Sequence, residues 1–553
     1  MKTLVASLFV FLGFAGCALS TAQKSAPVAA EPDRFADRPQ LVVGITVDQM
    51  KMEYLYRYWH LFTDGGFKRL VNDGFVCSNH HFNYAPTVTA SGHAAIFTGT
   101  TPAYNGITGN DWYQRGEGFV YCASDSTRQP VGTSGSDGQM SPHRMLTTTI
   151  SDELRLSNNF KSKVIGIALK DRGAILPAGH QPTAAYWFVG KDEGVWATSD
   201  YYMTELPEWV NKFNAKKLPE SYMEDGWNLL LGNEAYGISA DDNNPFEYPF
   251  RGQDRAAFPY DFSSVTEKRY DAFKSTPFAA TMSVDFAIEA IKAEQLGRDQ
   301  YPDMLAISFS NTDYAGHQFG PQSVEVQDTY LRLDRDLKRL FDFLDKEVGN
   351  GKYLVFLSAD HGGAHVPSYI NKYNMPAGYW KPQAMLETIE ERLRSAYGEG
   401  TYVLNYSNEQ IFLDRELIAS KSASVSEVAA QVASICREYP EVQMAWSLDE
   451  LMVSATTDPV VMSLQKGIHH QRSGDVVLIN LPGYIEYGFR GTTHGSPFVY
   501  DTHVPLIFYG HGVKQGELTR RVSITDIAPT VARLLRIGLP TGSTGDVIHE
   551  LCD

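Results

Sequence analysis

Six acidic and histidine residues stand at the ends of apolar runs or in short turns and loops, where a ligand can reach them. They are Asp48, Asp313, His317, Asp360, His361 and His494. Asp313 and His317 are four positions apart, so they share a face if their turn is helical. Carboxylate and imidazole ligands together suit Zn²⁺. Six ligands serve two ions with three each, and two ions roughly 4 Å apart clamp the attacking and leaving oxygens of an in-line phosphoryl displacement.

A hydroxyl at the start of a helix is the candidate nucleophile. Small residues follow Thr89, then an apolar run, then Gly99. This pattern predicts a short helix with Thr89 as its N-cap and Gly99 just beyond its end. The positive end of the helix dipole favours an alkoxide and an anionic substrate. Taken alone, Thr89 is more simply a capping residue, and it is the six metal-type ligands elsewhere that favour a catalytic role.

Three further polar residues are suited to holding an anion. Asn110 lies in the glycine-flanked turn 106–113 and offers an amide N–H to an oxyanion, although turn geometry alone explains an asparagine there. Lys170 and Arg172 follow the apolar run 163–169, and in an extended segment their side chains point to the same side. Two cations on one face at a strand end suit an anion, whereas alone they would more often form a solvated edge.

Buried strands must position these residues. Five apolar runs have the composition of such strands: 41–47, 163–169, 304–309, 353–357 and 504–509. Helices are predicted at 283–296, 324–348 and 526–535. Loops at the carboxyl ends of parallel strands carry ligand sites. We therefore expect an α/β sandwich with a largely parallel central sheet.

Two stretches interrupt the alternation of strands and helices. Residues 180 to about 280 are rich in aromatic residues, proline, asparagine and acids, and their weak periodicity predicts an inserted cap or lid. Residues 366 to about 480 form a second insertion, with helices near 382–396 and 425–438. The expected organisation is a signal peptide at 1–22, a flexible lead-in at 23–40, a catalytic domain at 41–540 and a C-terminal tail at 541–553.

The composition and the first residues indicate an exported globular protein. The net charge of −17 over 553 residues argues against a nucleic-acid partner. Lys2 and the apolar run 4–14 read as a signal peptide, cleaved either after Ala22 or, with lipid attachment, before Cys17. No later stretch is long enough for a transmembrane helix. We expect a soluble or lipid-anchored protein, in the periplasm of a Gram-negative bacterium.

Four cysteines remain beyond the signal peptide: Cys77, Cys122, Cys436 and Cys552. An oxidising compartment permits two disulfides among them, and four cysteines allow three connectivities. Proximity in the sequence favours Cys77 with Cys122 and Cys436 with Cys552. They lack CxxC spacing, so a cysteine zinc site is not expected.

The motifs occur in an order that resembles a known superfamily. The order is Asp48, Pro86-Thr87-Val88-Thr89-Ala90, Gly109-Asn110-Asp111-Trp112-Tyr113, Lys170-Asp171-Arg172, Asp313-x-x-x-His317, Asp360-His361-Gly362 and Thr493-His494-Gly495. Together they resemble the alkaline phosphatase superfamily over residues 41–540. The branch they resemble is the threonine-nucleophile, phosphate-irrepressible bacterial alkaline phosphatases (the PafA type). The Lys170-x-Arg172 pair is the feature that points to a phosphomonoesterase.

The resemblance implies a zinc-dependent hydrolase of small phosphomonoesters that forms a phosphothreonine on Thr89. Two Zn²⁺ ions are implied, the first held by Asp313, His317 and His494 and the second by Asp48, Asp360 and His361, with Thr89 as a further ligand. Asn110, Lys170 and Arg172 are implied to contact the phosphoryl oxygens. Thr87 competes as nucleophile, but the helix position and the motif prefer Thr89. Among the remaining histidines, His93 and His503 are expected to pack or support rather than to bind metal.

Three alternative functions fit part of the pattern. A nucleotide pyrophosphatase/phosphodiesterase shares the metal site and the threonine nucleophile but would lack a cationic pair like Lys170 and Arg172. A sulfatase is disfavoured because Thr89 lacks the Cys/Ser-x-Pro-x-Arg context of a formylglycine nucleophile. A non-catalytic metal-dependent binding protein is disfavoured by the intact nucleophile and ligands. The sequence gives neither the physiological substrate nor the oligomeric state.

Overall fold

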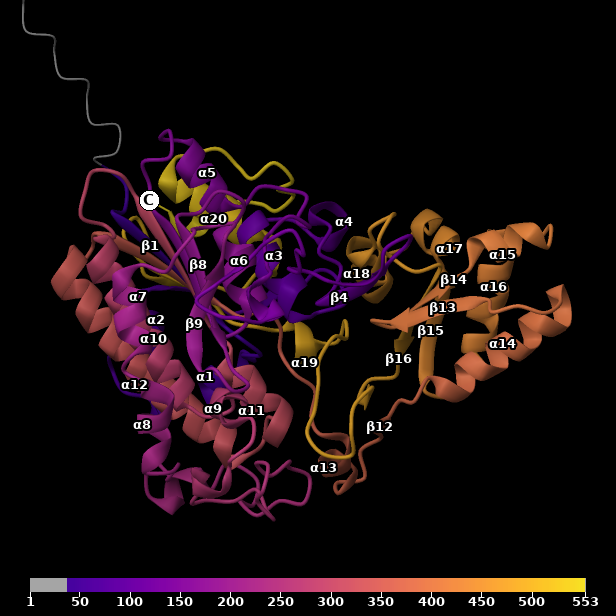
Figure 1. Ribbon diagram of the computed structural model, residues 1–553, viewed down its shortest axis with the longest axis horizontal. Helices are drawn as coiled ribbons and strands as arrows, with labels where there is room; N and C mark the ends of the chain where they lie inside the picture. The colour runs from indigo at the N-terminus through magenta and orange to yellow at the C-terminus, as the bar shows by residue number, and fades with distance from the viewer. Residues whose placement is uncertain (1–36, 553) are drawn as a thin grey trace, which may run out of the picture. The chain divides into compact units, whose positions relative to one another are not determined.

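A ten-stranded sheet forms the core of the structure, a computed structural model that describes residues 37–552 (Figure 1). The strand order is β19-β2-β18-β11-β1-β10-β7-β8-β9-β6. Five adjacent strands in the middle run parallel: β11 (Tyr353–Ser358), β1 (Leu41–Val47), β10 (Asp303–Phe309), β7 (Val164–Ala168) and β8 (Ala184–Val189). The expected α/β fold with a largely parallel central sheet is confirmed.

The sheet continues antiparallel on both sides of this parallel core. β18 (Leu506–Gly510) pairs with β11, and β9 (Val195–Ser199) pairs with β8. The outer strands are β2 (Phe75–Cys77), β19 (Gly516–Leu518) and β6 (Pro130–Val131). Segments of two or three residues carry no readable periodicity, which is why the sequence analysis did not predict these outer strands.

Helices cover both faces of the sheet (Figure 1). The three helices predicted around the core are confirmed as α10 (Phe278–Glu294), α12 (Val324–Leu344) and α20 (Ile527–Leu535). A π-helical turn, Asp345–Gly349, follows α12 and accounts for the longer predicted span. α3 (Thr89–Thr98) and α6 (Asp171–Ala178) pack against each other on the same side of the sheet as α20 (Figure 1).

Four neighbouring parallel strands place candidate functional residues at their carboxyl-terminal ends, on one side of the sheet. Asp48 follows β1, Asp360 follows β11 and Lys170 follows β7. The helix α11 (Asn311–Phe319), which carries Asp313, follows β10. Carboxyl ends of adjacent parallel strands open at the same edge, so residues far apart in the sequence come together there.

Helix α3 begins one residue earlier than predicted. Val88 is extended (φ −131°, ψ 161°) and is the N-cap, whereas Thr89 is the first helical residue and makes no capping hydrogen bond. The prediction that Thr89 is the N-cap is therefore wrong. Gly99 ends the helix in the left-handed region (φ 65°), as predicted. Because Thr89 makes no capping hydrogen bond, its hydroxyl is available to partners outside the helix.

The first insertion is shorter than predicted. Its first 20 residues include β8 and β9 of the central sheet, so the reading of the whole of 180–280 as a cap is wrong. Those strands are too rich in Trp, Tyr and Ala to show the aliphatic runs of the core strands. The rest carries the short helices α7 (Glu208–Asn214), α8 (Leu218–Glu224) and α9 (Arg269–Lys274).

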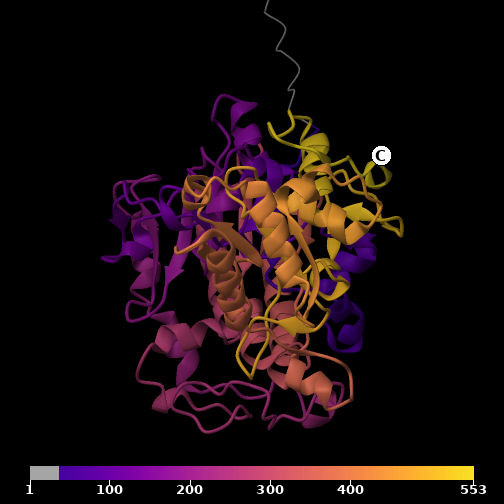
Figure 2. The ribbon, with the colours of Figure 1, turned by 90° about the vertical axis from the view of Figure 1, so that its right-hand side faces the viewer.

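The second insertion contains a small sheet of its own that the sequence analysis did not predict (Figure 2). Its strand order is β13 (Val403–Ser407), β14 (Gln410–Leu413), β16 (Val476–Asn480) and β15 (Val442–Ser447). The two predicted helices are confirmed as α14 (Gln383–Tyr397) and α16 (Val425–Cys436), and they share a separate hydrophobic core with that sheet.

The predicted disulfides are not formed. Cys77, Cys122 and Cys436 are free thiols, so neither Cys77–Cys122 nor Cys436–Cys552 exists in the described chain. Cys77, Cys122 and Cys436 pack in three different hydrophobic clusters, which sequence proximity does not reveal. The signal peptide, the residue Cys17 and most of the lead-in lie outside the described residues. Within the described part, no helix combines the length and apolar character needed to cross a membrane.

We predict that Gly92→Ala destabilises the protein. A Cβ at Gly92 in α3 would lie 2.1 Å from the backbone oxygen of Asp360, so the helix must move away from the strand end. Overpacking of this kind costs about 1–3 kcal/mol. Urea unfolding should show the loss as a lower midpoint. Gly135→Ala is the control, because its Cβ would meet its nearest heavy atom, Asp137 N, at 3.9 Å. Equal midpoints for the two variants would contradict the packing argument.

Candidate active site

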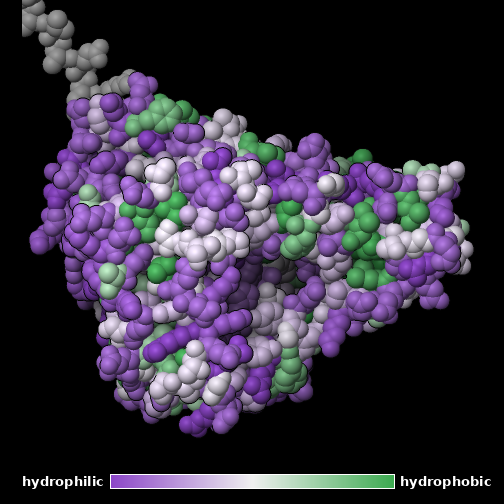
Figure 3. All heavy atoms as spheres, viewed as in Figure 1, coloured by the Kyte–Doolittle hydropathy of each residue, from purple (hydrophilic) through white to green (hydrophobic). Residues whose placement is uncertain are grey.

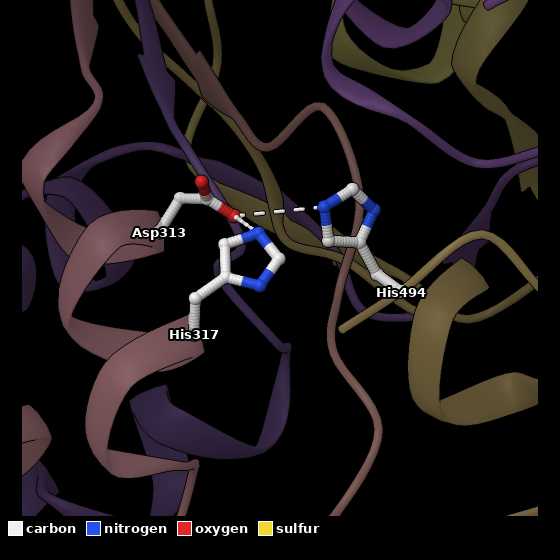
Figure 4. A group of neighbouring side chains, drawn as sticks. All are labelled: Asp313, His317 and His494. Atoms are coloured by element: carbon white, nitrogen blue, oxygen red, sulfur yellow. Dashed lines mark ion pairs between the residues drawn. The ribbon is translucent and has the colours of Figure 1, made fainter. Parts of the chain in front are cut away.

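One cluster of metal-type side chains joins helix α11 to the loop before α19 (Val499–Thr502). Asp313 and His317 lie one turn apart on α11, as their spacing predicts, with His317 Nε2 3.1 Å from Asp313 Oδ1. His494 points at the same oxygen from the loop, with its Nε2 at 3.6 Å (Figure 4). The three residues converge as expected for ligands of a single ion.

A second cluster shares Asp313 with the first and adds Asp48 and His361. His361 Nε2 lies 3.4 Å from Asp48 Oδ1 and 3.5 Å from Asp360 Oδ2. The ring of His361 stacks on that of His494, with centroids 3.4 Å apart. The two clusters are thus neighbours. Asp360 borders the second cluster rather than belonging to its tightest group.

The three histidines are oriented by backbone carbonyls. Each binds one through Nδ1: His317 that of Thr492 at 2.7 Å, His361 that of Gly362 at 2.8 Å and His494 that of Thr87 at 2.8 Å. A carbonyl only accepts, so each Nδ1 carries the proton and each Nε2 lone pair is left for a ligand. This arrangement fixes the tautomer and ring orientation of metal-binding histidines.

The buried side chains of the two clusters carry more negative charge than positive charge. Asp48, Asp313 and Asp360 are buried, and the ammonium group of Lys170 lies 2.7 Å from Asp48 Oδ2 and 2.6 Å from Asp313 Oδ2. Burial and the nearby Asp360 carboxylate raise the pKa of Asp48 well above its usual range, and burial raises the pKa of Asp360 to about 6. Among the described residues, Asp48 Oδ1 and Asp360 Oδ2 have no hydrogen-bond partner. Three carboxylates with one ammonium fit a site built for added cations.

Thr89 faces this charge cluster and Thr87 does not. Thr89 is 1% exposed, and its Oγ1 lies 3.4 Å from His361 Nε2 and accepts a hydrogen bond from Lys170 Nζ at 3.2 Å. The Thr87 hydroxyl donates instead to the backbone oxygen of Ser496 at 2.9 Å. The geometry therefore favours Thr89 over Thr87 as the nucleophile.

Asn110 is oriented by the start of helix α3. Its side-chain oxygen accepts a hydrogen bond from the backbone N–H of Ala90 at 2.9 Å. A backbone N–H only donates, so the oxygen of Asn110 faces Ala90 and its NH₂ group is the end left for an acceptor. Asn110 thus sits next to Thr89 with a donor to offer.

Lys170 and Arg172 do not share an extended segment, so that prediction is wrong. Lys170 is the N-cap of α6, and Arg172 is in the first turn of the helix. The two still line one cavity of about 640 Å³. The guanidinium group of Arg172 donates to the hydroxyl of Tyr121 at 3.1 Å, and Tyr121 in turn donates to Asp171. Arg172 is thereby held beside the site rather than inside the carboxylate cluster.

Gln49, which was not predicted as a site residue, holds two of the carboxylates. Its side-chain amide donates to Asp313 Oδ1 at 2.6 Å, and its backbone N–H donates to Asp360 Oδ1 at 3.2 Å. It adopts φ 63°, a left-handed conformation that is strained for a residue with a side chain. Its place directly after the strand-end Asp48 was the only available signal.

His93 is fully buried and packs against the site, as expected of a structural histidine. Its Nδ1 lies 2.9 Å from the backbone oxygen of Thr89 and 3.2 Å from Asp360 Oδ2, and its Nε2 lies 2.9 Å from Ser308 Oγ. It therefore links the start of α3 to the ends of β10 and β11. His503 stacks on His81 and lies in neither metal-type cluster of the described chain.

Comparison with known proteins identifies the family. Residues 42–498 match the family described as type I phosphodiesterase/nucleotide pyrophosphatase. The alkaline phosphatase PafA of Elizabethkingia meningoseptica is 44% identical over 531 residues, which cover 95% of this chain and 97% of that protein. The alkaline phosphatase PhoV of Synechococcus elongatus is 40% identical and covers 100% of this chain and 99% of its own. The crystal structure of PafA matches with a TM-score of 0.90 at 43% identity, covering 93% of this chain and 99% of that one. This chain belongs to the type I phosphodiesterase/nucleotide pyrophosphatase family, within the alkaline phosphatase superfamily.

Proposed function

We propose that the protein is an alkaline phosphatase, a phosphoric monoester hydrolase that acts through Thr89. The observation that carries this proposal is the arrangement of two metal-type clusters around one shared carboxylate, Asp313, with the Thr89 hydroxyl beside them. The full-length similarity to two proteins named alkaline phosphatases supports it.

The cation that fits these residues best is Zn²⁺, with two ions per chain. Asp313, His317 and His494 would hold one ion, and Asp48, Asp360 and His361 would hold the other with Thr89 as a further ligand. Their mixed carboxylate and imidazole donors are those that zinc prefers. Bound zinc ions lower the pKa of a coordinated hydroxyl and neutralise charge on the attacking and leaving oxygens.

The residues of the chain supply the rest of the reaction. Thr89 Oγ1 attacks phosphorus in line with the departing alcohol and forms a phosphothreonine, which water then hydrolyses. The N-terminus of α3 places partial positive charge at this oxygen. The NH₂ group of Asn110 and the cations of Lys170 and Arg172 bind the phosphoryl oxygens. These donors are fixed beforehand by Ala90 and Tyr121, so little reorganisation is needed as charge develops.

The cationic pair is the reason to prefer a monoesterase to the phosphodiesterase that shares the family. A monoester dianion has three nonbridging oxygens, and those that face the protein would be held by these two cations. Arg172 binds with a planar fork and Lys170 as a point charge. A diester has one less negative charge, and its second substituent would crowd these groups.

We also propose that the protein is exported. The charged start and apolar run of residues 1–22 support a signal peptide. The periplasm of a Gram-negative bacterium is the proposed location, with a lipid anchor on Cys17 as the alternative form. Export would place the enzyme where it meets external phosphate esters.

Removal of zinc should abolish the hydrolysis of a phosphate monoester. Elemental analysis of the purified protein should find two zinc ions per chain, and a chelator should abolish hydrolysis of an aryl phosphate until zinc is restored. His361→Ala should lose one ion and most activity, because its Nε2 is the imidazole donor of the second cluster. His60→Ala, at an exposed position outside both clusters, is the control. A single ion, or calcium in the site, would contradict the proposed metal set.

Substitutions at Thr89 and Thr87 should show which of the two threonines is the nucleophile. Thr89→Ser should keep substantial activity because the hydroxyl remains, whereas Thr89→Ala should lose about a thousandfold or more in kcat. Thr87→Ala should be far milder, since its hydroxyl is bonded to a backbone carbonyl. Rapid-quench trapping with labelled substrate should place phosphate on residue 89. Phosphate on Thr87, or full activity of Thr89→Ala, would show that the nucleophile is misassigned.

Lys170→Ala and Arg172→Ala should each harm a monoester more than a diester. Loss of one charge-assisted contact in a partly desolvated site costs roughly 2–4 kcal/mol, which is about 30- to 1,000-fold in kcat/KM. The measurement is kcat/KM for an aryl phosphate and the matching diester, with zinc content checked because Lys170 also pairs with Asp48 and Asp313. Equal losses on both substrates would remove the basis for choosing monoesterase over diesterase.

A further inference from the structure

A second cavity lies beside the metal-type clusters and reaches the start of Thr89's helix at Val88. It has a volume of about 390 Å³ and is lined by His317, His494 and Asn110 on the catalytic side. Its other wall comes from the second insertion, including Asn408, Glu409 and strand β16. The surface is hollowed between the catalytic body and this insertion (Figure 3). The cavity therefore joins the candidate active site to a part of the chain that the proposed reaction does not use.

The charged side chains on the wall of this cavity are acids. Glu409, Glu486 and Asp501 line it, and no lysine or arginine of the described chain does so. Burial, Glu486 and Asp501 raise the pKa of Glu409 to about 7, which agrees with three carboxyl groups near one another. Lys51, a cation that acts on Asp501 from outside the cavity, is already paired with Glu53 at 2.9 Å. An enzyme for anionic phosphate esters thus has an acidic wall beside its metal clusters.

Two of the cavity-lining side chains also carry unused acceptors. Asp501 is 1% exposed; its Oδ2 accepts hydrogen bonds from Gly495 and Ser496, while its Oδ1 has no partner among the described residues. Asn480 is 7% exposed, and its Oδ1 likewise has no partner in the described chain. Buried acceptors without donors are costly. A ligand that donates hydrogen bonds would relieve both.

The proposed reaction directs the leaving group toward this cavity, so the inference rests on the proposed function. In-line displacement places the leaving oxygen on the side of phosphorus opposite to Thr89. Thr89 approaches the cluster that contains His361, so the leaving oxygen meets the cluster of Asp313, His317 and His494. Both of those histidines line the acidic cavity. A neighbouring cavity near Tyr248 contacts His317 but not His494.

We propose that this cavity is a leaving-group subsite for phosphate monoesters whose alcohol carries a cationic amino group. The ammonium donates hydrogen bonds to Glu409 and to the unused oxygens of Asp501 and Asn480. Glu486, exposed at the rim, attracts the incoming cation. The phosphate dianion and the ammonium of one substrate are thereby bound by groups of opposite charge that line two different cavities.

The position of Glu409 is set by the hairpin between β13 and β14. Asn408 and Glu409 both have left-handed backbone conformations, with φ 51° and φ 54°. The side-chain amide of Asn408 donates to the backbone oxygen of Asp111 at 2.7 Å, next to Asn110. This contact fixes the turn against the catalytic body. Glu409 is consequently presented to the cavity by a turn that is itself tied to the site.

The test compares two substrates that differ in one charge. These are 4-(aminomethyl)phenyl phosphate and 4-methylphenyl phosphate, assayed near neutral pH, where the amine is protonated. Differences in intrinsic reactivity cancel when the ratio of their kcat/KM values is compared between variants.

Glu409→Gln and Glu486→Gln should each lower the ratio of cationic to neutral substrate by about 2- to 5-fold, the effect of a partly exposed ion pair. The double variant should lower it by about 10-fold, and added salt should shrink the wild-type preference. Asp501 is left intact because it also holds the loop of His494.

Controls separate this inference from the proposed function. Glu391→Gln, at an exposed position of the same insertion that does not line the cavity, should leave the ratio unchanged. The matching pair of non-hydrolysable benzylphosphonates, titrated by calorimetry, gives the same comparison without turnover. If the ratios and the phosphonate affinities are the same in wild type and both glutamate variants, the subsite is refuted and the hydrolase assignment stands. If neither phosphate is hydrolysed but the phosphonates still discriminate, the cavity binds the ammonium group, whereas the proposed hydrolase is wrong and the leaving-group role falls with it.

Discussion

The structure depends on the burial of more negative charge than its own cations balance. Asp48, Asp313 and Asp360 lie close together in the protein interior. The ammonium group of Lys170 lies between Asp48 and Asp313. Such an arrangement is costly in isolation, because buried carboxylates lose their hydration. It is tolerated where metal ions complete the charge balance. The surrounding structure therefore serves to keep mutually repelling groups close together.

The sheet and a set of supports provide that constraint. The carboxyl ends of adjacent parallel strands bring the three acids together, Gln49 donates hydrogen bonds to Asp313 and Asp360, and His93 packs against Asp360. Backbone carbonyls fix each histidine ring. None of these supports needs to move for the reaction, which suits a site that acts by preorganised charge.

Parts of the structure with a strong local signature could be predicted from the sequence. The buried strands appear as unbroken aliphatic runs, and the acids that follow them mark the ligand edge, so the fold class and the six metal-type residues could be inferred without coordinates. The spacing of Asp313 and His317 correctly indicated a helix. Gly99 marked the end of α3 because a left-handed residue there favours glycine.

Features determined by tertiary contacts could not be predicted in this way. The start of α3 is fixed by the extended Val88, not by the capping preference of Thr89. The strands β8 and β9 lack aliphatic runs and are recognisable only through their neighbours in the sheet. The roles of Gln49 and Tyr121 arise from partners distant in sequence, and the absence of the predicted disulfides follows from the separate cores in which the cysteines pack.

Residues 544–545 reach back to the helix that carries the candidate nucleophile Thr89. The backbone N–H groups of Thr544 and Gly545 both donate to the carbonyl oxygen of Gly99, at 2.9 and 3.1 Å. Helix α3 is thus completed by residues that are synthesised long after the helix itself. During synthesis the emerging polypeptide holds Thr89 but not the final support of its helix, and before His494 emerges it also lacks one of the candidate ligands. The candidate site would accordingly remain incomplete until both of these later segments have been synthesised and folded against helix α3.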